Sequence, residues 1–522
     1  MRNRSILGGL AFVIAGSLAG GLLGGRSATL PDQAGDQLGT YNQLLSLVQS
    51  RAADTVDPRV AIEGSIRGLV RTLDPHTNYL DPDDYRGMLE EQQGSFSGLG
   101  IVISKPSTDK PLTVISPLEG TPAFNAGIRA GDVISQIEGV DTLDMTIDEA
   151  LKRLKGPKGT PVTITVTRPG YDEVLHFTIV RDDIPTNSIR QAFLIRPGIG
   201  FIKIENFTRT TEHELEEKIK AMQKQGMTRL VLDLRRNPGR LLEQAVRVAD
   251  RFLGKDQMIV YTKGRINGSD QEYRSTGTGN RADLPLVVLV DKFSASASEI
   301  VAGAMQDHDR GLIVGNTTWG KGLVQTVYPL SHDAALALTT ARYYTPSGRL
   351  IQRDYNSLED YLSHDEKEED LVKSAKEVRH TDGGRTVYGG GGIHPDVIVD
   401  LDPTPKFVDQ LERAQIFFHF AVDYNARHKS VPKGFEVTVQ VLQEFQAFLD
   451  KRKVKWTPED IESSRERLKS EIKEAIASAL WGFEEGYKVY AENDRQIQKA
   501  LELFPQAQYL ANLSRGAAPA ER

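Results

Sequence analysis

The sequence predicts a multidomain α+β protein in which an α/β core and a β-rich module lie between two helical regions. At 522 residues the chain is longer than one compact hydrophobic core usually organises. Runs with strand-like patterns occupy the middle of the chain, whereas runs with helical spacing occupy both flanks. The apolar share of 39% and the charged share of 26% are those of ordinary globular proteins.

The first 28 residues are predicted to be a signal peptide or a membrane anchor. Arg2 and Arg4 precede an uncharged stretch of 21 residues, from Ser5 to Gly25, which approaches the length of a bilayer span. Seven of these residues are glycine, which weakens the stretch as a span. We favour an uncut anchor over cleavage after Ala19, and in both cases we expect the rest of the chain to be exported.

Residues 29–92 are predicted to be helical, and residues 93–182 to form a small β-rich module. Asp57 can cap a helix that has Pro58 in its first turn, and apolar residues follow at helical spacing. From about Gly94 the pattern changes to short β-type runs that glycine and proline interrupt, with one helical segment between them.

Residues 183–402 alternate apolar strands with helices, which is typical of an α/β layer fold. Residues 403–522 form a helical C-terminal extension, in which Thr457 and Pro458 open a long amphipathic helix. The aromatic run "IFFHFAVDY" in this extension is more typical of a core than of a partner surface. A dimer face on this run is the alternative, and it would make the protein a homo-oligomer.

Composition excludes several kinds of chemistry. The chain has no cysteine, and therefore no disulfide, no thiolate metal site and no cysteine nucleophile. The net charge of −7, with acids and bases spread along the chain, argues against a nucleic-acid partner. Neither an HExxH pair nor a glycine-rich phosphate loop occurs, so the sequence predicts no metal and no nucleotide cofactor.

Ser296 has two interpretations. It follows a strand of five apolar residues, Leu286–Val290, and opens a helix with Glu299 three positions on, which fits a capping box. The four residues 296–299 alone favour this structural role. The alternative is a nucleophile, because a serine at a strand-to-helix turn lies among free backbone N–H groups that can stabilise an oxyanion.

A nucleophilic serine needs a base, and Lys321 is the candidate. His308 lies at the far end of the same helix, and no G-x-S-x-G elbow occurs. A lysine acts as a base only when it is neutral, which burial favours. If the strand starts at Lys321, then Gln325 shares its face and can orient the amine. The alternative is a solvated loop lysine.

A third element is the turn Asn237–Pro238–Gly239, which follows a strand. Ligands of open α/β sheets bind at the carboxyl ends of strands, so the Gly239 amide is a candidate second oxyanion donor. The alternative is an ordinary turn between a strand and a helix.

These residues lie in ordered blocks that resemble the C-terminal processing peptidases, or tail-specific proteases, over roughly residues 40–402. "LDPHTNYLDPDDYRGMLEEQQGSFSGLGI" and "AGIRAGDVISQIEGV" are similar to the family's entry into its PDZ domain and to the PDZ core. "LDLRRNPG", "SASASEIVAGAMQD", "GKGLVQ", "ARYYTPSGR" and "GIHPDV" are similar to its protease blocks. The resemblance implies a ClpP/crotonase-like α/β protease core with an inserted PDZ domain.

The resemblance also implies roles for individual residues. It assigns Ser296 as the nucleophile, Lys321 as the general base 25 residues later and Gln325 as the supporting residue four further on. The amides of Gly239 and Ala297 would form the oxyanion hole. The chain departs from the family at Arg240, where a second glycine is usual, and this departure weakens the assignment of Gly239.

The PDZ domain implies a substrate class and a route to it. The amides of Leu99, Gly100 and Ile101 would bind the terminal carboxylate of a protein whose apolar tail adds as a strand. A plain glycine turn is the alternative for this loop. The resulting hypothesis is an exported serine endopeptidase without metal or cofactor, periplasmic or otherwise extracytoplasmic and held to the inner membrane if the anchor is uncut. The alternative from another class is a catalytically silent PDZ adaptor of the cell envelope.

Overall fold

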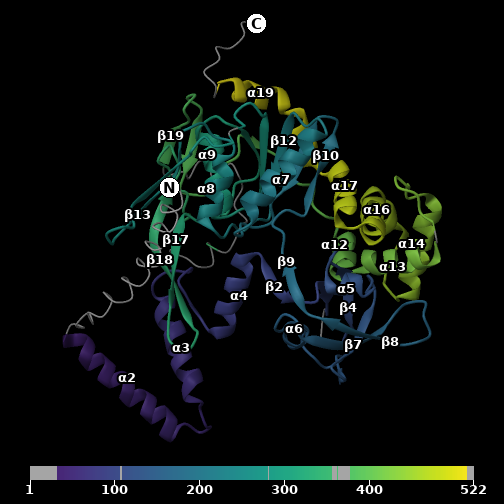
Figure 1. Ribbon diagram of the computed structural model, residues 1–522, viewed down its shortest axis with the longest axis horizontal. Coiled ribbons are helices and arrows are strands. Elements are labelled where there is room, and N and C mark those ends of the chain that lie inside the picture. The colour runs from purple at the N-terminus through teal and green to yellow at the C-terminus, as the bar shows by residue number, and fades with distance from the viewer. Residues whose placement is uncertain are drawn as a thin grey trace, which may run out of the picture. The chain divides into compact units, whose positions relative to one another are not determined.

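The computed structural model describes residues 32–105, 109–279, 281–355, 361, 377–428 and 430–513 (Figure 1). The predicted signal peptide or anchor at residues 1–28 lies outside the described residues. In the part of the chain that is described, no helix combines the length and the apolar character that a membrane crossing requires.

The described residues up to Asp74 belong to a unit of their own, with the helices α2 (Asp32–Arg51) and α3 (Pro58–Arg71). Helix α3 begins where the sequence predicts. The Asp57 side chain accepts the N–H of Arg59 at 2.8 Å, and the proline occupies the first turn. The cap supplies an acceptor for one of the amides that an α-helix leaves unpaired at its start.

In the second unit, helix α4 (Pro82–Gln93) leads into the β-rich module. Asp81 caps its start, and Gly94 ends it at a φ of 73°, where glycine has no steric penalty. Strand β2 (Ser95–Gly98) then pairs antiparallel with β9 (Asp182–Pro185), so the chain enters and leaves the module through one two-stranded ribbon.

The β-rich module is an antiparallel sheet of order β3-β4-β5-β7-β8, with β6 paired to β5. Its strands are β3 (Ile101–Ser104), β4 (Leu112–Pro117), β5 (Val133–Ile137), β6 (Val140–Asp141), β7 (Pro161–Thr167) and β8 (Leu175–Val180). Its helices are α5 (Pro122–Asn125) and α6 (Ile147–Leu154). Because β3 ends the sheet order, it is an edge strand to which a further strand can add.

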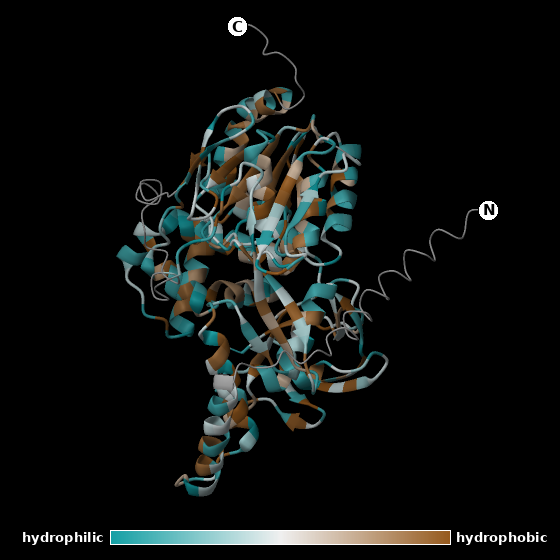
Figure 2. Cartoon of the chain, turned by 90° about the vertical axis from the view of Figure 1, so that its left-hand side faces the viewer, coloured by the Kyte–Doolittle hydropathy of each residue, from teal (hydrophilic) through white to brown (hydrophobic). Residues whose placement is uncertain are grey.

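The core has a six-stranded sheet of order β10-β11-β12-β15-β16-β21, parallel from β11 onward. Its strands are β10 (Gln191–Arg196), β11 (Ile199–Lys203), β12 (Arg229–Asp233), β15 (Leu286–Val290), β16 (Leu312–Gly315) and β21 (Val397–Ile398). These strands are among the most hydrophobic segments of the chain (Figure 2). Parallel strands covered on both faces are expected to be continuously apolar, as β15 is.

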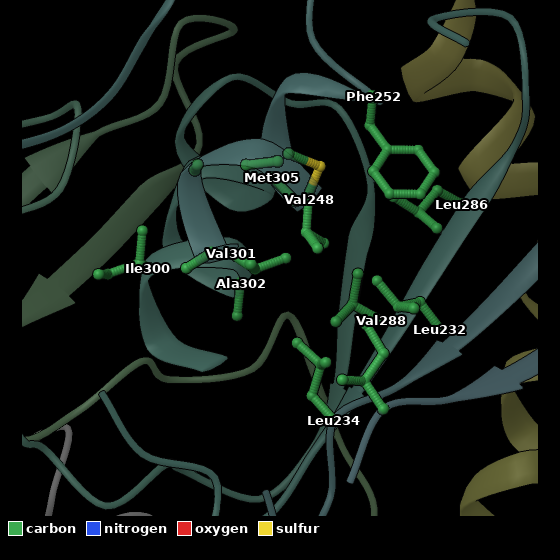
Figure 3. Close-up of a cluster of buried hydrophobic side chains, with 14 of the residues drawn as sticks. Leu232, Leu234, Val248, Phe252, Leu286, Val288, Ile300, Val301, Ala302 and Met305 are labelled. Carbon is green, nitrogen blue, oxygen red and sulfur yellow. The ribbon is translucent and has the colours of Figure 1, made fainter. Parts of the chain in front are cut away.

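Helices α7 (Thr211–Lys224), α8 (Leu242–Asp250) and α9 (Ala297–Asp307) pack on one face of this sheet. Figure 3 shows Val248 of α8 and Val301 of α9 in the same cluster as Val288 of β15. The opposite face is covered by the end of the chain, helices α18 (Arg495–Glu502) and α19 (Phe504–Leu513). Alternate strand residues therefore point into two separate hydrophobic cores.

A second sheet of order β1-β18-β13-β14, in which β17 also pairs with β18, adjoins helix α9 through β13. Its strands are β1 (Asn78–Leu80), β13 (Met258–Gly264), β14 (Gln271–Arg274), β17 (Leu323–Pro329) and β18 (Ala335–Tyr344). Strands β19 (Glu377–His380) and β20 (Thr386–Gly389) form a separate hairpin. The loop between β16 and β17 brings Lys321 to this sheet.

The helical extension forms its own hydrophobic cluster. Its helices are α12 (Lys406–Arg413), α13 (Ile416–Arg427), α14 (Val439–Lys451), α15 (Pro458–Ser463), α16 (Arg465–Trp481) and α17 (Phe483–Asn493). The long helix predicted from Thr457 is wrong in its length, because it breaks at the buried Ser464. The aromatic run contributes Phe417, Phe420 and Tyr424 to the hydrophobic cluster of the helical extension. Association of two copies through this run stays a prediction.

Candidate active site

Three serines alternate at the turn between β15 and α9, and the structure distinguishes them. Ser294 is fully buried, and its hydroxyl donates to the carbonyl oxygen of Leu234 at 2.8 Å. Ser298 is also fully buried, and its hydroxyl donates to the carbonyl oxygen of Asn237 at 2.9 Å. Ser296 is partly exposed. Of the three, the middle serine is the one that an external substrate can reach.

The backbone of Ser296 is strained. Its φ of 54° and ψ of −111° lie outside the regions that L-residues ordinarily populate. Helix α9 starts at the next residue, Ala297, so the hydroxyl is held where the unpaired amides of the first turn gather. The cap interpretation and the nucleophile interpretation both place the serine at this position.

Lys321 and Gln325 are brought together, but not by the regular strand that the sequence predicts. Strand β17 starts at Leu323, two residues after the lysine, and its register shifts between Val324 and Gln325. Bulges of this kind redirect side chains. The Nζ of Lys321 donates to the Oε1 of Gln325 at 3.2 Å, and both side chains are partly buried.

The orientation of Gln325 depends on a residue that the sequence interpretation missed. Its Nε2 donates to the backbone carbonyl of His76, just before β1. A glutamine has one donor end and one acceptor end, so this contact turns the Oε1 toward Lys321. His76 lies in the block "LDPHTNYLDP", which is part of a segment that resembles the family. That resemblance did not indicate that the backbone carbonyl of His76 contacts Gln325.

Gly239 lies against the nucleophile turn. Its φ is 89°, and a Cβ on it would lie 2.5 Å from the carbonyl oxygen of Ala295 and 2.6 Å from the N of Ala297. Only glycine can make this approach, because backbone atoms surround the missing side chain. The structure therefore brings the two predicted oxyanion residues, Gly239 and Ala297, into contact.

The amide of Gly239 does not point into an open oxyanion hole in this structure. It donates to the Oδ1 of Asn237 at 2.8 Å, which forms a local side-chain turn. Asn237 is fully buried, and its Nδ2 donates to the carbonyl of Ile204 at 2.8 Å, so the turn is fixed. The N–H of Gly239 is therefore engaged within its own turn.

Arg240, the departure noted above, adopts a φ of 114°, a conformation that favours glycine. Its guanidinium pairs with the carboxylate of Glu91 in α4, and its backbone forms an isolated parallel bridge with Phe207. This residue therefore connects the Gly239 turn to the helix that leads into the β-rich module.

The predicted tail-binding loop, Leu99 to Ile101, ends at the first residue of edge strand β3. Gly100 has a φ of 78°, and a Cβ there would lie 2.3 Å from the Cβ of Thr121. Its carbonyl accepts the N–H of Leu118 at 2.9 Å, and the carbonyl of Leu99 accepts the N–H of Ala123 at 3.0 Å. The loop is thus held with its carbonyls engaged, at the start of an edge strand.

Two buried polar side chains border the site and were not assigned a catalytic role from the sequence. Glu299 was recognised only as a capping residue, and Tyr343 lies in the block "ARYYTPSGR". Burial raises the pKa of the Glu299 carboxyl more than its hydrogen bonds to Thr318 and neighbouring amides lower it. Burial and the nearby Glu299 raise the pKa of the Tyr343 hydroxyl well above its usual range. No group of metal-ligating side chains occurs within the described residues.

Comparison with known proteins identifies the fold and the chemistry. The profile of Peptidase family S41 matches residues 198–357, and a PDZ domain profile matches residues 113–168. The carboxy-terminal-processing protease of Bartonella bacilliformis is 40% identical over 320 residues, which cover 60% of this chain and 73% of that protein. The chain belongs to the carboxy-terminal-processing protease family. The predicted family, fold class and serine-type endopeptidase activity are confirmed.

One further relative of this protease family agrees. The carboxyl-terminal-processing protease of Picosynechococcus is 40% identical over 287 residues, which cover 55% of this chain and 68% of that protein. Among solved structures, the photosystem II D1 C-terminal processing protease aligns with 70% of this chain and 88% of its own at 28% identity, with a TM-score of 0.36. A family of unknown function matches residues 407–482, in the helical extension.

The described fold separates this protease into a peptide-binding part and a hydrolytic part. The PDZ match covers β5, β6 and β7, which belong to the same sheet as the edge strand β3, and PDZ domains bind peptide C-termini as an added strand. The S41 match contains Gly239, Ser296, Lys321 and Gln325. The sequence prediction of no metal and no cofactor stays a prediction.

Proposed function

We propose that this protein is an exported endopeptidase that binds substrate tails in its PDZ domain and cleaves with a dyad of Ser296 and Lys321. The observation that carries this proposal is the partly exposed Ser296 at the start of α9, together with the oriented amine of Lys321. Gln325 is the residue that aims the amine.

The tail would bind first. The amides of Leu99, Gly100 and Ile101 receive the terminal carboxylate, and the preceding residues of the tail pair with edge strand β3. The last side chain enters an apolar site, because Ile101 and Ile103 are partly buried hydrophobic residues against the module's core. Proteins with apolar C-termini are therefore the expected substrates.

Hydrolysis then proceeds through an acyl-enzyme. The neutral amine of Lys321 takes the hydroxyl proton as the Oγ of Ser296 attacks the scissile carbonyl carbon. The C–N bond breaks as the amine returns that proton to the leaving nitrogen. The lysine next takes a proton from water, which attacks the ester, and the Oγ recovers its proton as the bond breaks.

The oxyanion formed in both steps would be stabilised by the amides of Ala297 and Gly239. The second donor becomes available when the peptide of Gly239 turns away from the Oδ1 of Asn237. Removal of one such donor generally lowers kcat by about 10²–10³-fold. The gain of the Gly239 donor would therefore raise kcat enough to activate the enzyme.

A silent PDZ adaptor would also have the amide of Gly239 bonded to Asn237. The peptidase and adaptor functions therefore require a direct test. Purified wild type, Ser296→Ala and Lys321→Ala are incubated with an unfolded protein that has an apolar tail. The proposal expects turnover by wild type alone, with tail affinity equal in all three. Full turnover by Lys321→Ala would refute the dyad, and an inactive wild type that still binds the tail would favour the adaptor.

Export and membrane attachment are proposals that rest on Arg2, Arg4 and the uncharged stretch after them. Fractionation of cells that produce the full chain, followed by the intact mass of the recovered protein, tests both. The uncut mass in the membrane fraction supports the anchor, a shorter mass in the extracytoplasmic soluble fraction supports a signal peptide, and a cytoplasmic protein contradicts export.

A further inference from the structure

The carboxylate of Glu299 connects the serine turn to the lysine loop. Its Oε2 accepts the backbone N–H of Ser296 at 2.7 Å and the backbone N–H of Lys321 at 2.9 Å. Its Oε1 accepts the N–H of Gly320 at 2.7 Å and the hydroxyl of Thr318 at 2.5 Å. The side chain is fully buried, so water does not compete for these contacts.

The hydroxyl of Tyr343 connects the same two segments through their carbonyl groups. It lies 3.1 Å from the carbonyl oxygen of Ser296 and also contacts the carbonyl oxygen of Lys321. Tyr343 is 1% exposed and lies on β18, the strand that pairs with β17. Between them, Glu299 and Tyr343 therefore contact both the N–H and the C=O of each proposed catalytic residue.

We propose that Glu299 and Tyr343 are positioning residues that fix Lys321 relative to Ser296 for proton transfer. The inference rests on the proposed dyad. Neither group is placed to react itself, because both carboxylate oxygens of Glu299 are engaged by donors and the hydroxyl of Tyr343 faces two main-chain oxygens.

The chemistry of the carboxylate matters as well as its shape. An ionised glutamate accepts hydrogen bonds at both oxygens, whereas a glutamine accepts at one and donates at the other. Both oxygens of Glu299 accept a backbone N–H, so in Glu299→Gln the NH₂ group faces an N–H donor whichever way the amide is turned. That buried donor then has no acceptor, which is costly. This substitution keeps the volume of the side chain and removes the connection on one side.

The first experiment measures kcat and KM of Glu299→Gln and Tyr343→Phe on a protein substrate with an apolar tail. Displacement of a reacting group by about 1 Å costs about 10²-fold in rate, so kcat of Glu299→Gln is expected to fall by about that factor. Loss of one hydroxyl in Tyr343→Phe is expected to lower kcat by about 10-fold. KM and the affinity for a free tail peptide should stay within about 2-fold of wild type, since the PDZ domain is unchanged.

Matched variants separate positioning from general structural damage. Glu214 is a glutamate of α7 that accepts the N–H of Ile189 at 3.0 Å and the hydroxyl of Thr210 at 2.6 Å. Tyr344 is the neighbour of Tyr343, and its ring stacks on another tyrosine. Glu214→Gln and Tyr344→Phe should retain kcat.

Thr318 provides a rescue test for the same connection. Thr318→Val removes the hydroxyl that donates to Glu299 and should lower kcat, whereas Thr318→Ser keeps that hydroxyl and should restore it. This pair keeps the inference testable if Glu299→Gln does not fold, because each member changes only one group beside the carboxylate.

The inference is overturned if folded Glu299→Gln and Tyr343→Phe keep kcat within about 3-fold of wild type, or if Thr318→Val and Thr318→Ser have the same kcat. Loss of kcat together with tail affinity in every variant would also overturn it, because that result indicates collapse. Failure of the proposed dyad gives a different result, since Ser296→Ala or Lys321→Ala would then keep turnover.

Discussion

The Oε1 of Gln325 lies 3.2 Å from the Nζ of Lys321, and the other end of the same amide donates to the carbonyl of His76. The amide oxygen of Gln325, which is neutral, therefore orients the amine of Lys321. A neutral partner orients a lysine without the charge stabilisation that would keep it protonated.

This relationship predicts the behaviour of Gln325→Glu. If neutral Lys321 is the base, kcat of the wild type rises with pH as the amine loses its proton. A carboxylate beside this amine favours its charged form, so kcat at neutral pH should fall by about 10-fold or more. The rise of kcat should then occur at higher pH than in the wild type. Gln325→Met, whose uncharged thioether is only a weak acceptor, should lower kcat without changing the pH at which the rate rises. A pH–rate profile of Gln325→Glu that overlays the wild-type profile would disprove the assignment.

The strained Arg240 predicts an order of stabilities. Arg240→Gly removes a positive-φ penalty of about 1 kcal/mol and an exposed ion pair of similar or smaller worth, so its free energy of unfolding should stay within about 1 kcal/mol of wild type. Arg240→Ala keeps the penalty and loses the pair with Glu91, so it should be less stable than Arg240→Gly. Denaturant titration measures both, and the reverse order would contradict the strain.

Gly100 separates tail binding from hydrolysis. Its missing Cβ would overlap Thr121 at 2.3 Å, so Gly100→Ala should weaken binding of a tail peptide by at least about 10-fold and raise KM. Gly120 has a similar φ of 76° with open space around it, so Gly120→Ala carries the backbone strain without the overlap. Equal tail affinities for the two variants, measured by titration calorimetry, would show that the loop does not bind the tail.

Glu474 in α16 predicts a pH-dependent stability. Burial, with a smaller contribution from Glu471, raises its pKa from 4.5 to about 8. The folded state then binds this proton more tightly than the unfolded state, so the stabilisation is full below about pH 4.5 and is lost as pH rises through about 8. Local stability of α16 should fall by roughly 2–4 kcal/mol over that range.

Hydrogen-exchange protection of the α16 amides measures this fall. Glu474→Gln should flatten the pH dependence and protect the helix better than wild type at pH 8. Glu466→Gln on the same helix, at an exposed position, should leave the wild-type slope. An unchanged slope in Glu474→Gln would mean that this carboxyl is not responsible.

Local sequence signals predicted the parts of this protein that local chemistry determines. Asp57 with Pro58 starts α3, and Ser296 precedes α9, because caps and prolines act within one helical turn. The alternation of strands and helices in residues 183–402 likewise predicted an α/β core, because burial on two faces requires continuously apolar strands.

Contacts between distant segments could not be predicted in this way. Arg235, 5% exposed, donates to the carboxylate of Asp494 at 2.8 Å, and this buried pair anchors the end of the chain on the core sheet. The two residues are 259 positions apart, and no periodicity links them. The hydrogen bond from the amide of Gly239 to Asn237 could not be predicted from the sequence either. This bond depends on the rotamer of the Asn237 side chain, and the sequence specifies only the residue type.

Covalent labelling of the active-site serine tests the central claim most directly. The full-length protein is treated with an organophosphonate fluoride, which transfers its phosphonyl group to an activated hydroxyl and releases fluoride, and the modified peptide is sequenced by mass spectrometry. The account predicts one label on Ser296, formed much more slowly in Lys321→Ala and absent in Ser296→Ala. A label on Ser294 or Ser298, or labelling of Ser296 at an undiminished rate in Lys321→Ala, would contradict it.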